Sequence, residues 1–142
     1  SVASRGLGDV YKRQEYMIAS MLDLASHTIE SPVENTEKFE QTLFKEIGKP
    51  VEIDSRYGST YFGHIFAGSY AAGYYSYMWS EVLDSHAFEI FDKEGLYDRE
   101  YAEKLEDFVY SSGNSVDLMN QYEKFRGEEP NVNSLLRKRG LN

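Results

Sequence analysis

The chain of 142 residues contains no cysteine, only three prolines and only three histidines. Without cysteine there can be no disulfide framework and no metal site built on thiolates, and a reducing compartment is compatible with the composition. No apolar run reaches the roughly 18 residues that a membrane-spanning helix requires. No segment has the apolar core of a secretory signal. The sequence therefore predicts a protein without disulfides and without a membrane partner.

Positive charge is also scarce. There are 15 lysine and arginine residues against 24 aspartate and glutamate residues, which gives a formal net charge of −9. Such a surface repels a phosphate backbone, so we expect no nucleic-acid partner. The one dense basic cluster, Arg137-Lys138-Arg139, fits the C-terminus of a helix, where the helix dipole favours cations.

Aromatic residues are abundant, at 15% of the chain, and twelve of them are tyrosines. Tyrosine combines a large apolar ring with a hydroxyl that needs a partner, so it suits semi-polar clefts and interfaces. It suits the wet rim of an ordinary core equally well. The tyrosine content by itself decides nothing.

Residues 1–14 differ from the rest, because they show no apolar helical stripe and carry two glycines. This stretch looks like vector-derived or assembly-derived sequence, and we interpret residues 1–14 as a non-native leader. Residues 15–142 would then be the natural helical segment, starting near Glu15 inside a helix.

Apolar residues recur at helical spacing through most of the remaining chain. Residues 49–69 interrupt this pattern with glycine, serine and aromatic residues, and they predict a long irregular loop of functional importance. A brief strand pairing at 51–54 is the only extended element we consider, so the predicted fold class is all-α. Helices are expected from Tyr16 to the residues before Pro32, from Asn35 or Thr36 to Gly48, from about Ala71 to Phe91, from Asp98 to Gly113, from Ser115 to Gly127, and after Asn131.

The helix expected at 71–91 would carry two different faces. An apolar face, which predicts contact with the core, comprises Tyr75, Trp79, Val82, Leu83, His86 and Ile90. A face of three phenols and a carboxylate comprises Tyr70, Tyr74, Tyr77 and Glu81. A plain surface helix would show lysine and glutamate there instead. This second face either meets a further layer of protein or lines a polar cleft.

None of the three histidines belongs to an H-E-x-x-H motif, and no two have the i, i+4 spacing that places two imidazoles on one metal ion. We therefore predict no metal ligands in this chain. His86 fits a hydrogen-bonded core residue, and His27 fits a solvent or cap contact near a helix end. His64 in the loop is either a structural residue or a donor to a substrate carbonyl or oxyanion.

Two stretches resemble a known family. The segment HIFAGSYAAGYYSYMWSEVLDSHAF, from His64 to Phe88, resembles the signature of the thimet oligopeptidase and peptidyl-dipeptidase family of zinc metallopeptidases. The segment GNSVDLMNQYEKFRGEEPNVNSLLRKRGLN resembles the usual end of that family's chain, and SRYGSTYFGHIF fits the approach to the loop. The bacterial peptidyl-dipeptidase branch is the more similar one. The resemblance covers Glu15 to Asn142.

The resemblance implies an all-helical, zincin-like catalytic domain with a deep channel that admits short peptides. A zinc-bound water attacks the peptide carbonyl in such enzymes. By resemblance, Tyr70 and Tyr77 are catalytic and donate to the tetrahedral oxyanion. His64 and Tyr74 would bind substrate, and Gly68 would belong to the glycine-rich loop that closes on the substrate.

The family's H-E-x-x-H helix and its third zinc-ligand glutamate are expected upstream of the segment present here. We therefore expect the isolated chain to be inactive and to bind no zinc, whereas its full-length parent would be a cytoplasmic, zinc-dependent peptide hydrolase. Helix faces deprived of their usual neighbours favour self-association of the chain. The alternative is a non-catalytic helical interaction domain descended from this family. A gene that encodes H-E-x-x-H upstream would favour the first reading, and a natural start codon near Glu15 the second.

Overall fold

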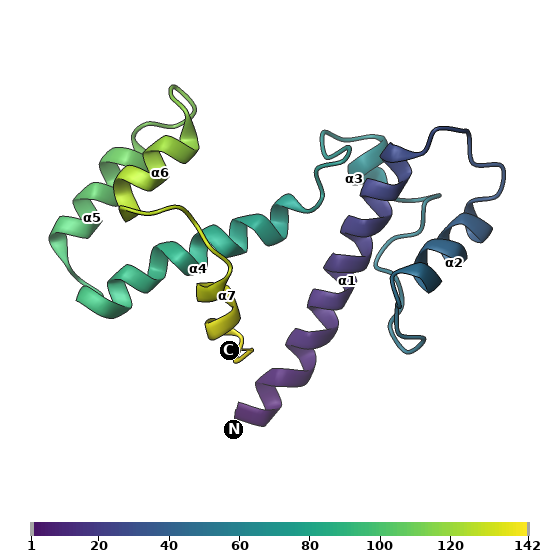
Figure 1. Ribbon diagram of the computed structural model, residues 1–142, viewed down its shortest axis with the longest axis horizontal. Helices are drawn as coiled ribbons and strands as arrows, with labels where there is room; N and C mark the ends of the chain where they lie inside the picture. Colours follow the sequence, from purple (N-terminus) through teal and green to yellow (C-terminus); the bar gives the residue numbers. More distant parts are fainter. Residues whose placement is uncertain (1, 142) are drawn as a thin grey trace. The chain divides into compact units, whose positions relative to one another are not determined.

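The computed structural model describes the backbone of residues 2–141 and the side chains of residues 11–141. It divides into two compact units, one ending at Tyr77 and the next beginning at Met78. The described residues form helices, turns and irregular segments, with no strand among them (Figure 1). The prediction of an all-α fold is confirmed.

The first unit is built on α1, Val2–Thr28. This helix also runs through most of residues 1–14, so it begins earlier than the sequence pattern indicated; the interpretation of those residues as a leader stays a prediction. The second half of α1 supplies the core of the unit, because Ala19 and Leu22 are fully buried. They contact the buried side chains of Phe62, Ile65 and Tyr74.

The second helix, α2 (Thr36–Glu46), packs against α1 through partly buried Phe39, Leu43 and Phe44. Its N-cap is Asn35, whose side-chain oxygen accepts a hydrogen bond from the Lys38 N–H at 2.8 Å. The helix ends before Gly48, which has the left-handed φ of +66° that glycine accommodates best. Both ends of this helix confirm the sequence prediction.

The long loop that follows is also confirmed, with the short helix α3 (Gly63–Phe66) inside it. The next helix, α4 (Ser76–Glu94), begins five residues later than predicted. Ala72 has a left-handed φ of +53°, a conformation that an α-helix does not accept, so residues 70–75 form turns instead. The expected helix start at Ala71 was wrong for this reason.

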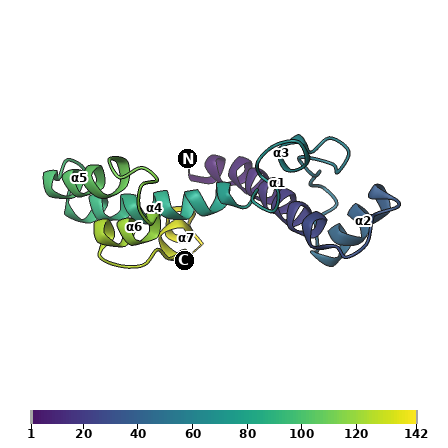
Figure 2. The ribbon, with the colours of Figure 1, turned by 90° about the horizontal axis from the view of Figure 1, so that it is seen from above.

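In the second unit, α4 is followed by α5 (Arg99–Leu105), a π-helical turn η1 (Glu106–Tyr110), α6 (Leu118–Arg126) and α7 (Asn133–Lys138), as Figures 1 and 2 show. Asp98 caps α5 as predicted. Asp117 caps α6 in place of Ser115, because the aspartate oxygen accepts from the Asn120 N–H at 2.8 Å. Gly127, with φ of +78°, ends α6 as expected.

His86 lies at the centre of the second unit and is fully buried. Its Nδ1 is 3.0 Å from the Tyr122 hydroxyl, and its Nε2 is 3.2 Å from the Arg126 guanidinium and 3.3 Å from the Glu128 carboxylate. The prediction of a hydrogen-bonded core histidine is confirmed. The apolar face of α4 is confirmed only near its middle, because Val82 is buried whereas Trp79 is 39% exposed.

The basic cluster at the chain end connects α7 to α4 through ion pairs. Three ion pairs run antiparallel along the two helices: Arg137 with Glu89, Lys138 with Asp84, and Arg139 with Glu81. These charges are therefore used inside the unit, in and next to the last turn of α7. Within the described part of the chain, no helix is long and apolar enough to cross a membrane.

Candidate functional site

Seven aromatic side chains gather in the first unit and include four of the five predicted site residues. We refer to them as the aromatic cluster: Tyr16, Tyr57, Phe62, His64, Tyr70, Tyr74 and Tyr77. They come from α1, from the loop with α3, from the turns that lead into α4, and from the first turn of α4. The path of this loop therefore brings residues that are far apart in the sequence close together in space.

The base of the aromatic cluster is buried. Phe62 and Tyr74 are 1% and 2% exposed, and their rings meet edge to face with centroids 5.0 Å apart. Tyr57 stacks on Phe62 at 4.4 Å. Such edge-to-face and offset contacts add to the hydrophobic free energy of burying the rings. The base provides a rigid apolar support for the residues above it.

The rim of the aromatic cluster is accessible. The rings of Tyr70 and Tyr77 are stacked, with centroids 5.4 Å apart and an interplanar angle of 11°. Tyr77 is 40% exposed, Tyr70 is half-buried and His64 is exposed, with its ring 6.1 Å from that of Tyr70. Interaction with the Tyr70 hydroxyl raises the pKa of the Tyr77 phenol. The Tyr77 hydroxyl therefore keeps its proton and interacts with the Tyr70 hydroxyl on the rim.

Tyr74 differs from Tyr70 and Tyr77 in its environment. Burial, and then the nearby Tyr57, raise the pKa of its phenol well above the usual value. The sequence placed it on one helical face with Tyr70, Tyr77 and Glu81, but Tyr70 and Tyr74 precede α4, and Glu81 pairs with Arg139 in the second unit. The three phenols are neighbours because of the turns at 70–75 rather than because of helical spacing.

Asp23, which was not among the predicted site residues, binds those turns. Its carboxylate is fully buried and accepts hydrogen bonds from the Ala72 N–H at 2.9 Å and from the Tyr74 N–H at 2.8 Å. His27 Nδ1 lies 2.9 Å from the same carboxylate. The sequence signal for this role is a carboxylate between two leucines in an otherwise apolar helix segment. A charge buried in such a segment is kept only when it is paired or hydrogen-bonded, so its position indicates a specific partner.

Gly68 lies where the loop passes close to its own backbone. A Cβ atom at this position would lie 2.7 Å from the His64 carbonyl oxygen, a distance that real side chains do not show. The same carbonyl accepts a hydrogen bond from the Tyr70 N–H at 3.3 Å. Glycine at 68 thus permits the loop to fold back, which places His64 and Tyr70 on the same rim.

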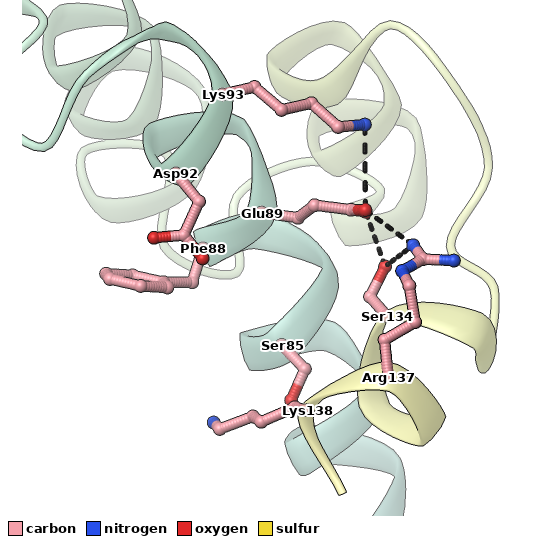
Figure 3. Close-up of a pocket in the computed structure, with 8 residues that line it drawn as sticks. All are labelled: Ser85, Phe88, Glu89, Asp92, Lys93, Ser134, Arg137 and Lys138. Carbon is pink, nitrogen blue, oxygen red and sulfur yellow. Dashed lines mark hydrogen bonds and ion pairs between the residues drawn. The ribbon is translucent and has the colours of Figure 1, made fainter. Parts of the chain in front are cut away.

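A metal site is not assembled by the residues whose side chains are described, because no three or more His, Asp or Glu side chains among them converge. The second unit contains a groove of about 480 Å³ lined by residues of α4 and α7 (Figure 3). Its central carboxylate, Glu89, accepts hydrogen bonds from Ser134 and Arg137, and the Lys93 ammonium lies 3.6 Å away. These contacts connect two helices, and the aromatic cluster remains the better candidate site.

The rim of the aromatic cluster thus carries two phenol hydroxyls and an imidazole within an all-helical chain. The profile of Peptidase family M3 matches residues 3–141, and the chain belongs to this family. The family shown by the comparison agrees with the resemblance seen in the sequence.

Individual relatives carry related names. The chain is 36% identical over 135 residues to dipeptidyl carboxypeptidase of Salmonella typhimurium and to that of Escherichia coli, covering 92% and 93% of this chain and 20% of each relative. It is 45% identical over 80 residues to oligopeptidase A of Escherichia coli, covering 56% of this chain and 12% of that protein. The chain thus spans about a fifth of the dipeptidyl carboxypeptidases that it matches.

Proposed function

We propose that this chain is the substrate-binding C-terminal part of a cytoplasmic, zinc-dependent oligopeptidase that hydrolyses short peptides in the manner of a peptidyl-dipeptidase. One observation carries the proposal: in a member of Peptidase family M3, the rim of the aromatic cluster presents the phenols of Tyr70 and Tyr77 beside His64.

In the proposed reaction, the hydroxyls of Tyr70 and Tyr77 donate hydrogen bonds to the oxyanion that forms when water attacks the peptide carbonyl. His64 holds the peptide backbone, and Tyr74 and Gly68 shape the substrate side. The described side chains do not form a zinc site. In this proposal, the metal that would polarise the carbonyl and activate the water would be held by other residues of the complete gene product.

The test is a paired assay of the 142-residue chain and the complete gene product with a quenched fluorescent peptide, with and without zinc. We expect activity in the complete product alone, and we expect a chelator to abolish it. Inactivity of both proteins would overturn the proposal. Chelator-sensitive hydrolysis by the 142-residue chain would instead overturn the assignment of the metal to another part of the protein.

A second candidate is a non-catalytic helical interaction domain. It is favoured by an exposed apolar stripe on α1, where Met17, Met21 and Leu24 are 53%, 42% and 36% exposed. This stripe also suits self-association of the chain or contact with further segments of a larger protein. A complete gene product that binds short peptides or a protein partner without hydrolysing peptides would support this candidate over the first.

A further inference from the structure

We propose that Asp23 is a positioning residue for the candidate site: it sets the geometry of Tyr70 and Tyr77 by holding the turns between them to α1. The inference rests on the proposed function for its catalytic consequence, but the anchoring itself concerns this chain alone. Asp23 acts through the backbone, because its carboxylate binds the N–H groups of residues 72 and 74.

Burying the carboxylate of Asp23 costs free energy. A carboxylate with no exposed surface loses its hydration, and this loss is tolerated only where hydrogen bonds or charges replace the water. Here each carboxylate oxygen accepts one backbone N–H, Oδ1 from Ala72 and Oδ2 from Tyr74. Both carboxylate oxygens thus accept hydrogen bonds from a segment about 50 residues away in the chain.

The segment that Asp23 binds is strained. Ala72 adopts a left-handed φ of +53°, which an L-residue with a Cβ disfavours. Strained backbone persists where the surroundings determine it, and the bond from the Ala72 N–H to Asp23 supplies such a constraint.

The segment that Asp23 binds lies between the two phenols in the sequence. Tyr70 lies two residues before Ala72, and Tyr77 lies three residues after Tyr74, so this segment connects the two stacked rings. The Gly73 N–H donates to the Tyr70 carbonyl at 2.8 Å, and the Tyr77 N–H lies 3.4 Å from the Tyr74 carbonyl. A shift of the turn would therefore move both hydroxyls relative to each other. A misplacement of about 1 Å is enough to cost an enzyme a large part of its rate.

His27 also contacts the Asp23 carboxylate. Its Nδ1 lies 2.9 Å both from Asp23 Oδ1 and from the Asp23 carbonyl, one turn earlier in α1, and its ring stacks on Phe66 of α3 at 5.7 Å. The imidazole thus orients the carboxylate from α1 while contacting the loop that carries His64. Asp23 and His27 together connect α1 to both sides of the candidate site.

The experiment has two readouts on the variants Asp23→Asn and Asp23→Ala. The first is residue-resolved amide hydrogen exchange in the 142-residue chain, which needs no activity. Loss of a hydrogen bond to a charged acceptor should accelerate exchange at the Ala72 and Tyr74 amides by about 10- to 100-fold. Asparagine keeps one acceptor oxygen, so Asp23→Asn should fall between the native chain and Asp23→Ala.

The matched control is Leu22→Ala, one residue away and equally buried. This change weakens the core of the first unit and should accelerate exchange at protected amides throughout that unit, whereas the Asp23 variants should act selectively at residues 72 and 74. The anchoring role of Asp23 would be overturned if Asp23→Ala left exchange at these two amides unaltered. It would also be overturned if exchange there changed only in parallel with the whole unit.

The second readout is peptide hydrolysis by the complete gene product. We expect Asp23→Asn to lower kcat by about ten-fold or more while KM changes less, because the misplaced phenols are needed chiefly in the transition state. Selective exchange at 72 and 74 with an unchanged kcat would overturn the positioning role. A native gene product without hydrolytic activity would instead refute the proposed function, while the exchange data would still decide the anchor.

Discussion

The rings of Tyr70 and Tyr77 lie parallel, 5.4 Å apart, although the two residues belong to different elements, Tyr70 to a turn and Tyr77 to the first turn of α4. The two phenols therefore lie side by side on the rim of the aromatic cluster, and under the proposed function both donate to the oxyanion.

Tyr70→Phe and Tyr77→Phe should each lower kcat of the complete gene product by about 10²–10³ with a smaller effect on KM, because an oxyanion donor acts mainly in the transition state. Steady-state kinetics with a fluorogenic peptide measures both parameters. Tyr110→Phe, at a 71% exposed tyrosine in the second unit, is the matched control and should behave as the native protein does. Unchanged kcat in both rim variants would remove these residues from the mechanism.

Gly68→Ala should destabilise the first unit by about 1–3 kcal/mol, because the added methyl group would overlap the His64 carbonyl oxygen and displace the loop. Gly63→Ala in the same loop is the control: its Cβ would meet nothing within 4 Å, so we expect no loss. Urea unfolding followed by NMR signals of the first unit gives both free energies. Equal stability of the two variants would show that the contact at Gly68 relaxes without cost.

The second unit should lose stability as the pH falls below about 6.5. Burial, and then the charge of Arg126, lower the pKa of His86, so the unfolded chain binds a proton in a range where the folded unit does not. Stability rises with pH wherever the unfolded state binds more protons, and the contribution of His86 is therefore present above the unfolded pKa and lost on acidification. Thermal unfolding between pH 7.5 and 5 measures this slope, and in His86→Gln it should largely disappear.

A further loss should occur at lower pH through Glu89 (Figure 3). A hydrogen bond from Ser134, and the charges of Arg137 and Lys93, lower the pKa of this carboxyl to about 2. Its contribution is complete above the ordinary carboxyl pKa of 4.5 and is lost between about 4.5 and 2 as the carboxylate is protonated.

Glu89→Gln tests this contribution. In denaturant unfolding as a function of pH, the variant should be less stable than the native chain near neutral pH and should show a weaker decline in this acid range. Glu106→Gln, at an exposed residue of η1, is the control and should retain the native decline. An identical pH profile for Glu89→Gln and the native chain would refute the role of Glu89.

Local chemistry explains which helix ends could be predicted. Asn35 and Asp98 cap their helices with side-chain oxygens three residues from the N–H groups they bind, and Gly48 and Gly127 end helices with left-handed φ values. All of these interactions lie within a few neighbouring residues, so the pattern of residue types is sufficient. The N-terminus of α4 was misplaced because a contact with a distant residue of α1 prevails over the local helical preference.

The sequence by itself determined the helical class, the long loop, the family and the residue types of the candidate site, since periodicity, capping residues and the segment from His64 to Phe88 are all local properties of the chain. The tertiary structure decided how those residues meet. The stacking of Tyr70 on Tyr77 and the burial of Tyr74 arise from turns held by Asp23, whose partners lie about 50 residues away. Helical spacing does not encode such a contact, because it forms only when the loop folds back onto α1.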